Sequence, residues 1–178
     1  MITVHDRHFK LYMPEAEILN EVSRVAMEIS HDLKSLNPLF CPTLTGSFMF
    51  MADLAKALDF DAETCFVKYA SYAGMQSTGT VRADLPFPAA CRNRHVVIVE
   101  DIVDTGITMD AMLRAVEALQ PASVHIATFL FKPGSFTKQF PIDYIGRSIA
   151  NDFIVGYGMD YDGLGRFYRD IYVVDNSE

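Results

Sequence analysis

Apolar residues recur at helical spacing in three stretches of the chain. From Pro14 to Leu36, one face carries Ile18, Leu19, Val22, Val25, Ala26, Ile29 and Leu33. This period of three to four residues predicts an amphipathic helix. A second helix is predicted from Phe48 to Leu58. A third helix has its apolar face at Met109, Met112, Leu113, Val116 and Leu119 and is closed by Pro121.

Short, continuous apolar runs between these helices predict buried strands. The clearest are His95–Val99 and Val124–Phe131, which flank the third helix and make a right-handed strand–helix–strand unit. Further strands are predicted at Pro38–Leu44, Cys65–Tyr72 and Thr80–Leu85. Repeated alternation of this kind predicts an α/β fold, with an open, mostly parallel β-sheet flanked by helices.

The domain organisation follows from length and from the tail of the chain. We expect a single domain over the 178 residues, with a core at roughly 14–140. The segment at roughly 141–178 has short strands and many turn residues, and it predicts a small C-terminal subdomain, or hood. Ala73–Gly79 is polar, lacks periodicity and is bracketed by glycines, so we expect a mobile loop there.

Composition excludes several classes of protein. The formal net charge of −8 argues against general affinity for nucleic acid, and no apolar run is long enough to span a membrane. The N-terminus lacks a secretion signal. Cys41, Cys65 and Cys91 are odd in number and lack metal-site spacing, which fits a reduced, cytoplasmic protein. The histidines are scattered, and we expect no functional role for them.

The candidate chemistry lies in the loop from Glu100 to Thr108, between the strand at His95–Val99 and the third helix. Ligands of open α/β sheets bind at the carboxyl ends of strands. Thr105–Thr108 offers hydroxyls and consecutive N–H groups at a helix N-terminus, which suits a phosphate. The adjacent carboxylates of Glu100 and Asp101 suggest that the ligand also carries hydroxyl groups or a metal ion.

A purely structural interpretation competes with this one. Thr105 or Thr108 could simply cap the helix, with Asp104 favouring the helix dipole. For Asp-Thr-Gly alone the two interpretations carry about equal weight, because short motifs are weak signals. The complete nine-residue string after an apolar strand is far more specific.

That string resembles the 5-phosphoribosyl-1-pyrophosphate (PRPP) signature of type I phosphoribosyltransferases. Other stretches are similar to the hypoxanthine (6-oxopurine) branch of this family, and together they extend over most of the chain. They are Leu44–Ser47 (pyrophosphate loop), Ser71-Tyr72 with Gln76–Gly79 (flexible catalytic loop), Lys132-Pro133 (base recognition) and Phe153–Tyr161 (C-terminal block). The family often has lysine or arginine where this chain has Thr45, which leaves only backbone amides for pyrophosphate there.

The resemblance implies a purine-salvage enzyme that transfers the phosphoribosyl group of PRPP to hypoxanthine or guanine, with Mg²⁺ as cofactor. The implied catalytic residues are Asp104, Ser71 and Tyr72. The implied PRPP-binding residues are Glu100, Asp101, Asp104, Thr105, Gly106, Ile107, Thr108, Thr45, Gly46 and Arg166. The implied purine-binding residues are Lys132, Phe153, Ile154 and Asp160, and the implied metal ligands are Asp160, Glu100 and Asp101.

Several alternatives stay open at this point. Arg166 and Arg169 compete for contact with pyrophosphate, and the spacing from Asp160 favours Arg166. A transferase for xanthine and guanine is one other activity. A non-catalytic PRPP-sensing regulator on the same fold is another, although the acidic charge speaks against a nucleic-acid surface. The resemblance also implies a homodimer or homotetramer, with no nucleic-acid or membrane partner.

Overall fold

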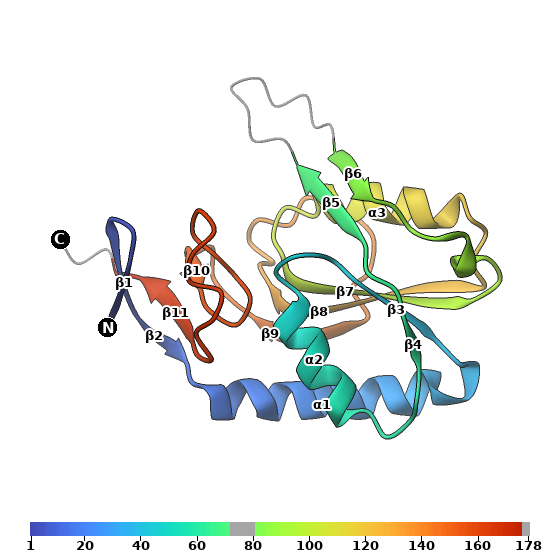
Figure 1. Ribbon diagram of the computed structural model, residues 1–178, viewed down its shortest axis with the longest axis horizontal. Coiled ribbons are helices and arrows are strands. Elements are labelled where there is room, and N and C mark those ends of the chain that lie inside the picture. Colours follow the sequence, from blue (N-terminus) through green and yellow to red (C-terminus); the bar gives the residue numbers. More distant parts are fainter. Residues whose placement is uncertain (72–80, 176–178) are drawn as a thin grey trace.

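The centre of the molecule is a five-stranded parallel β-sheet (Figure 1). The computed structural model describes residues 1–71 and 81–175. In spatial order the strands are β4 (Glu63–Thr64), β3 (Leu39–Pro42), β7 (His95–Val103), β8 (Ser123–Phe131) and β9 (Tyr144–Ser148). Because every pairing is parallel, the carboxyl ends of all these strands lie along one edge of the sheet.

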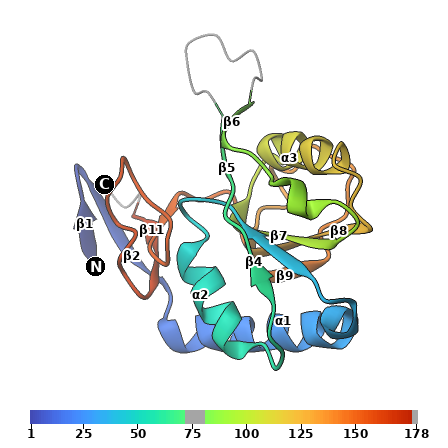
Figure 2. The same cartoon turned by 45° about the vertical axis from the view of Figure 1, so that its right-hand side comes forward.

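Helices cover both faces of this sheet (Figures 1 and 2). The helices α1 (Glu15–Leu33) and α2 (Phe48–Ala57) pack on one face, and α3 (Ile107–Glu117) packs on the other. Along β7, Val97 and Val99 belong to the core under α1 and α2, whereas Val96 and Ile98 belong to the core under α3. A strand buried on both sides explains the continuous apolar run in this part of the sequence.

A smaller antiparallel sheet joins the two ends of the chain. Its strands, in order, are β1 (Ile2–Val4), β2 (Arg7–Met13), β11 (Ile171–Val174) and β10 (Ile154–Val155). Val4, Phe9 and Val155 form its core. A separate hairpin consists of β5 (Lys68–Ser71) and β6 (Val81–Leu85), and two short 3₁₀ helices, η1 (Lys34–Leu36) and η2 (Ala89–Cys91), complete the described elements.

The predicted fold class is confirmed, but the boundaries of two strands differ from the prediction. β7 continues to Val103, so Glu100 and Asp101 stand within the strand rather than in the loop after it. The strand expected at Cys65–Tyr72 begins only at Lys68, after the separate short strand β4.

The hood is assembled differently from the sequence-based expectation. The C-terminal segment does not form it alone, because β2 pairs with β11 and brings residues 1–13 into the small sheet. Conversely, β9 lies beyond residue 140 but pairs with β8 in the large sheet. Within the described part of the chain, no helix has the length and apolar character needed to cross a bilayer.

Replacing Phe9 with alanine tests the contribution of the N-terminal strands. Phe9 is fully buried in the small sheet, so Phe9→Ala is expected to lower the free energy of unfolding by about 3–5 kcal/mol in urea denaturation. Leu11→Ala on the same strand is the control. Its side chain is 53% exposed, and its loss should change stability by about 0.5 kcal/mol or less. Equal effects of the two substitutions would contradict this packing.

Candidate active site

The loop after β7 presents backbone N–H groups at the start of α3. Gly106 is the N-cap of this helix, and its φ of +80° is a conformation that favours glycine. A Cβ atom at Gly106 would lie 2.6 Å from a ring carbon of Phe136. The N-cap residue is therefore neither Thr105 nor Thr108, although Oγ1 of Thr105 accepts a long hydrogen bond of 3.4 Å from the N–H of Ile107, the first residue of the helix. The first turn of an α-helix also contains further N–H groups that have no partner within the helix, and these can bind an anion.

A cavity of about 260 Å³ opens at this helix N-terminus. Its lining consists of Glu100, Ile102, Val103, Asp104, Thr105, Gly106, Ile107, Thr108 and Met109. The cavity thus gathers most of the predicted PRPP-binding residues at one place. A helix N-terminus with N–H donors is a ready-made site for a phosphate group.

Two neighbouring carboxylates stand near the end of β7. Burial, together with the negative charge of Asp101, holds the pKa of Glu100 well above its ordinary value. Burial also raises the pKa of Asp101. Two acids whose charged forms are disfavoured in this way are stabilised by a ligand that brings hydroxyl donors or a cation.

Close backbone contacts bring two other segments to this pair. Gly46, in the loop between β3 and α2, lies so near Asp101 that a Cβ atom there would meet the carboxylate at 1.7 Å. Gly158 has a φ of +96°, and a Cβ atom on it would lie 2.0 Å from the carbonyl oxygen of Gly46. Side chains at these two positions would force the segments apart.

A second cavity, of about 240 Å³, unites the predicted purine-binding residues. It is lined by Asp101, Ile102, Asp104, Lys132, Phe153, Ile154, Met159 and Asp160. It shares Ile102 and Asp104 with the first cavity, so the two cavities are neighbours. Lys132 follows β8 and is buried, and its Nζ lies 3.2 Å from Oδ2 of Asp104.

Aromatic contacts hold Phe153 at this second cavity. Its ring packs edge-on against Tyr161, with a centroid distance of 5.5 Å, and more distantly against Phe9. The guanidinium group of Arg7 lies 5.9 Å from the centroid of the Phe153 ring. Phe153 remains 39% exposed, so part of the ring is available for stacking on a ligand.

The structure separates the two candidate arginines. Nη2 of Arg166 lies 2.7 Å from Oδ1 of Asp160, and Nη1 donates to the carbonyl oxygen of Gly158 at 2.6 Å. The side chain of Arg169 is 77% exposed and reaches Glu15 instead. Arg166 is therefore the arginine that the fold brings next to Asp160. It also lines a third cavity, of about 400 Å³, between His5 and the loop at residues 163–168.

Two residues beside the second cavity were not predicted, and part of the predicted catalytic loop lies outside the described residues. Arg7 and Phe9 support the second cavity from β2, and only the alternation of apolar and polar residues around Phe9 could have indicated them. Tyr72 and Gln76–Gly79 lie outside the described residues. For Ser71, only the backbone, at the end of β5, is described.

The predicted metal ligands do not all converge. Among residues 1–71 and 81–175, Asp160, Glu100 and Asp101 do not form one close ligand cluster. Both carboxylate oxygens of Asp160 already have partners, because Oδ2 accepts a hydrogen bond from the N–H of Gly163 and Oδ1 pairs with Arg166. The chemistry of the Glu100 and Asp101 pair, two carboxylates with raised pKa values, nevertheless suits a hard cation such as Mg²⁺.

Comparisons with known proteins agree with this arrangement. The family model described as "Phosphoribosyl transferase domain" matches residues 14–162. The hypoxanthine-guanine-xanthine phosphoribosyltransferase of Tritrichomonas foetus is 35% identical over 159 residues, covering 89% of this chain and 85% of that protein. The hypoxanthine phosphoribosyltransferase of Escherichia coli K12 is 35% identical over 155 residues, covering 85% of this chain and 87% of that protein.

A solved structure extends the likeness to three dimensions. The structure of the Trypanosoma cruzi hypoxanthine phosphoribosyl transferase superposes with a TM-score of 0.87 at 34% identity, covering 98% of this chain and 95% of that chain. The matching family model and this structural likeness, together with the cavity at the N-terminus of α3, identify the fold as that of a type I phosphoribosyltransferase. Within that class, the chain belongs to the hypoxanthine phosphoribosyltransferase family.

The raised pKa of Glu100 predicts a pH-dependent effect on stability. A carboxyl group whose pKa is higher in the folded state costs stability as pH rises above its unfolded-state pKa of about 4.3. Glu100→Gln should therefore raise the Tm at pH 8, and this gain should shrink as the pH approaches 4. Exposed Glu117, on α3, provides a control, because Glu117→Gln removes the same charge without relieving that burial. A Glu100→Gln protein no more stable than wild type at pH 8 would contradict this interpretation.

Proposed function

We propose that this protein transfers the 5-phosphoribosyl group of PRPP to a 6-oxopurine base in purine salvage. Hypoxanthine and guanine are the proposed acceptors, and the products are the nucleoside 5′-monophosphate and pyrophosphate. The observation that carries the proposal is the second cavity. Lys132, Asp104 and Phe153 line it, and it lies beside the first cavity, at the N-terminus of α3, which suits a phosphate. The similarity to the hypoxanthine-guanine-xanthine phosphoribosyltransferase of T. foetus and to the hypoxanthine phosphoribosyltransferase of E. coli supports hypoxanthine as an acceptor, and the former relative also supports guanine.

The base-binding roles follow from hydrogen-bond chemistry. The Lys132 ammonium can donate to the 6-oxo group, while the neighbouring Asp104 carboxylate can accept the proton from N7 as N9 attacks C1 of the sugar. Phe153 would stack on the purine ring, and the backbone of Ile154 would contact its edge. Removal of the N7 proton makes N9 more nucleophilic, so the pair both orients and activates the base.

The PRPP-binding roles occupy the first cavity and its surroundings. Residues 105–108 would hold the 5′-phosphate through N–H groups and hydroxyls, and Glu100 and Asp101 would hold the ribose hydroxyls. Arg166 and the loop amides of Thr45 and Gly46 would contact pyrophosphate. Mg²⁺, when bound, would neutralise charge on the leaving pyrophosphate, with Asp160 and the Glu100–Asp101 pair contributing directly or through water and substrate oxygens.

The proposal also covers the oligomeric state, the loop with Ser71 and Tyr72, and the cellular compartment. The T. cruzi structure concerned the role of the C-terminal region in the oligomeric state and enzymatic activity of that relative, which supports self-association here, as a homodimer or homotetramer. Ser71 and Tyr72 would belong to a loop that closes over the substrates and excludes water. The cysteines are free thiols, which supports a reducing compartment such as the cytoplasm.

The direct test is nucleotide formation from PRPP, Mg²⁺ and each purine base. Hypoxanthine and guanine should react, and adenine should have a kcat/KM lower by about 10⁴, because its 6-amino group presents a donor to the donor Lys132. Lys132→Ala should lose most activity on 6-oxopurines and narrow this gap, whereas Lys56→Ala, exposed on α2, should change neither. Equal use of adenine and hypoxanthine would refute the role of Lys132. Binding of PRPP without turnover of any base would favour the alternative function, a non-catalytic PRPP-sensing regulator.

The role of Asp104 as proton acceptor is tested separately. Asp104→Asn keeps the shape but removes the base, so kcat should fall by about 10²–10⁴ while PRPP binding, followed by calorimetry, changes little. Asp61→Asn makes the same chemical change at an exposed position outside both cavities and should leave kcat unaltered. A near wild-type kcat for Asp104→Asn would remove this residue from the mechanism.

A further inference from the structure

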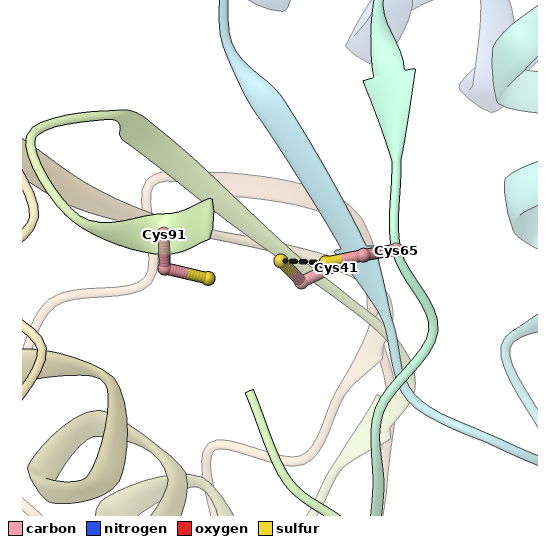
Figure 3. A group of neighbouring side chains, drawn as sticks. All are labelled: Cys41, Cys65 and Cys91. Atoms are coloured by element: carbon pink, nitrogen blue, oxygen red, sulfur yellow. Dashed lines mark hydrogen bonds between the residues drawn. The ribbon is translucent and has the colours of Figure 1, made fainter. Parts of the chain in front are cut away.

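All three cysteines of the chain meet at one place, although they are far apart in the sequence. Cys41 lies on β3, Cys65 directly follows β4, and Cys91 is the last residue of η2. Their Sγ atoms all lie within 4.8 Å of one another, and Figure 3 shows the three side chains pointing toward a common centre. Cys41 and Cys91 are buried in the core under α3, and Cys65 is partly accessible at the edge of that core.

Cys41 and Cys65 are the closest pair in this cluster. Their Sγ atoms are 3.0 Å apart, and a hydrogen bond joins them. The register of β3 and β4 pairs Phe40 with Thr64, so the next residues, Cys41 and Cys65, face each other across adjacent strands. Neighbouring strands are separated by about 4.8 Å, which lies within the Cα–Cα range of about 4.4–6.8 Å that disulfides require.

We propose that Cys41 and Cys65 form a reversible thiol–disulfide site whose oxidants are low-molecular-weight disulfides such as oxidised glutathione. The Cys65 thiolate attacks one sulfur of the oxidant, giving a mixed disulfide and releasing one thiolate. Cys41 then loses its proton and attacks Sγ of Cys65, which forms the intramolecular disulfide and releases the second thiolate. Two protein thiols are oxidised, and one small disulfide is reduced to two thiols.

The environments of the three thiols support this order of attack. The hydrogen bond from the Cys41 thiol lowers the pKa of Cys65, and the same bond, with burial, raises that of Cys41. Burial raises the pKa of Cys91 to about 11. Cys65 is therefore both the most accessible of the three and the one most readily deprotonated, as an attacking thiol must be.

The bond would link two segments that lead toward the proposed active site. β3 runs from Cys41 into the loop that carries Thr45 and Gly46, and the N–H of Leu44 in that loop donates to the carbonyl oxygen of Val67 at 2.7 Å. Val67 stands two residues after Cys65 and leads into β5. A disulfide here would therefore link β3 to the segment after β4, just before the first continues into the loop with Thr45 and Gly46 and the second into β5.

Mass spectrometry of the whole protein after incubation with oxidised glutathione tests the proposal. The wild type should lose two of its three free thiols, and its mass should fall by two hydrogen atoms without a retained glutathione adduct. The cysteines lie in different tryptic peptides, at residues 35–56, 57–68 and 83–92. The first two peptides should be linked, and dithiothreitol should release them.

Two variants distinguish this pair from the third thiol. Cys91→Ser keeps the pair and should still form the bridge, whereas Cys65→Ser should form no intramolecular disulfide. A wild-type bridge to Cys91, a persistent glutathione adduct or three unreacted thiols would overturn the proposal, and the wild-type peptide map gives this answer even if a variant fails to fold. A stoichiometric soft metal ion in chelator-free protein, blocking oxidation until it is removed, would also overturn it in favour of a thiolate metal site.

Discussion

The burial of β7 on both faces is the constraint on which the rest of the molecule depends. Between α3 on one side and α1 and α2 on the other, positions 96–99 can hold only apolar side chains. Polar side chains can occur in β7 only where the strand extends beyond the helices that cover its two faces. Glu100 and Asp101 occupy that end of the strand and Asp104 directly follows it, so the packing of the core decides where these candidate site residues lie.

The carboxylates at this strand end make the local fold costly without a ligand. Their pKa values are raised because burial disfavours the charge of both, and the charge of Asp101 adds to this at Glu100. Gly46 lies against Asp101 and Gly158 lies against Gly46 with no side chain between them, so three segments of the chain meet beside the two cavities. Two adjacent acids in such a partly buried position stabilise a fold poorly, whereas they are well suited to holding ribose hydroxyls or a cation.

The predictable parts of the structure are those whose signal is local in sequence. β7, α3 and β8 follow from continuous or periodic apolar runs, and the nine residues after Val99 carry a recognisable motif. The end of β7 was placed too early because acidic residues interrupt its apolar run. The strands β1 and β2 were missed because their partner, β11, lies at the other end of the chain. The convergence of the cysteines depends on the register of β3 and β4, which residue spacing does not encode.

The neighbouring positions of Lys132 and Asp104 explain how one pair could both select and activate a base. They follow adjacent parallel strands, and their side chains meet at 3.2 Å, a cationic donor beside an anionic acceptor. The edge of a 6-oxopurine that carries O6 and N7 is complementary, because O6 accepts a hydrogen bond and a protonated N7 donates one. Adenine offers an amino donor in place of O6 and would leave the buried ammonium facing another donor. On this proposal the interaction that rejects adenine also orients N7 toward Asp104, so base selectivity and proton removal arise from the same two side chains.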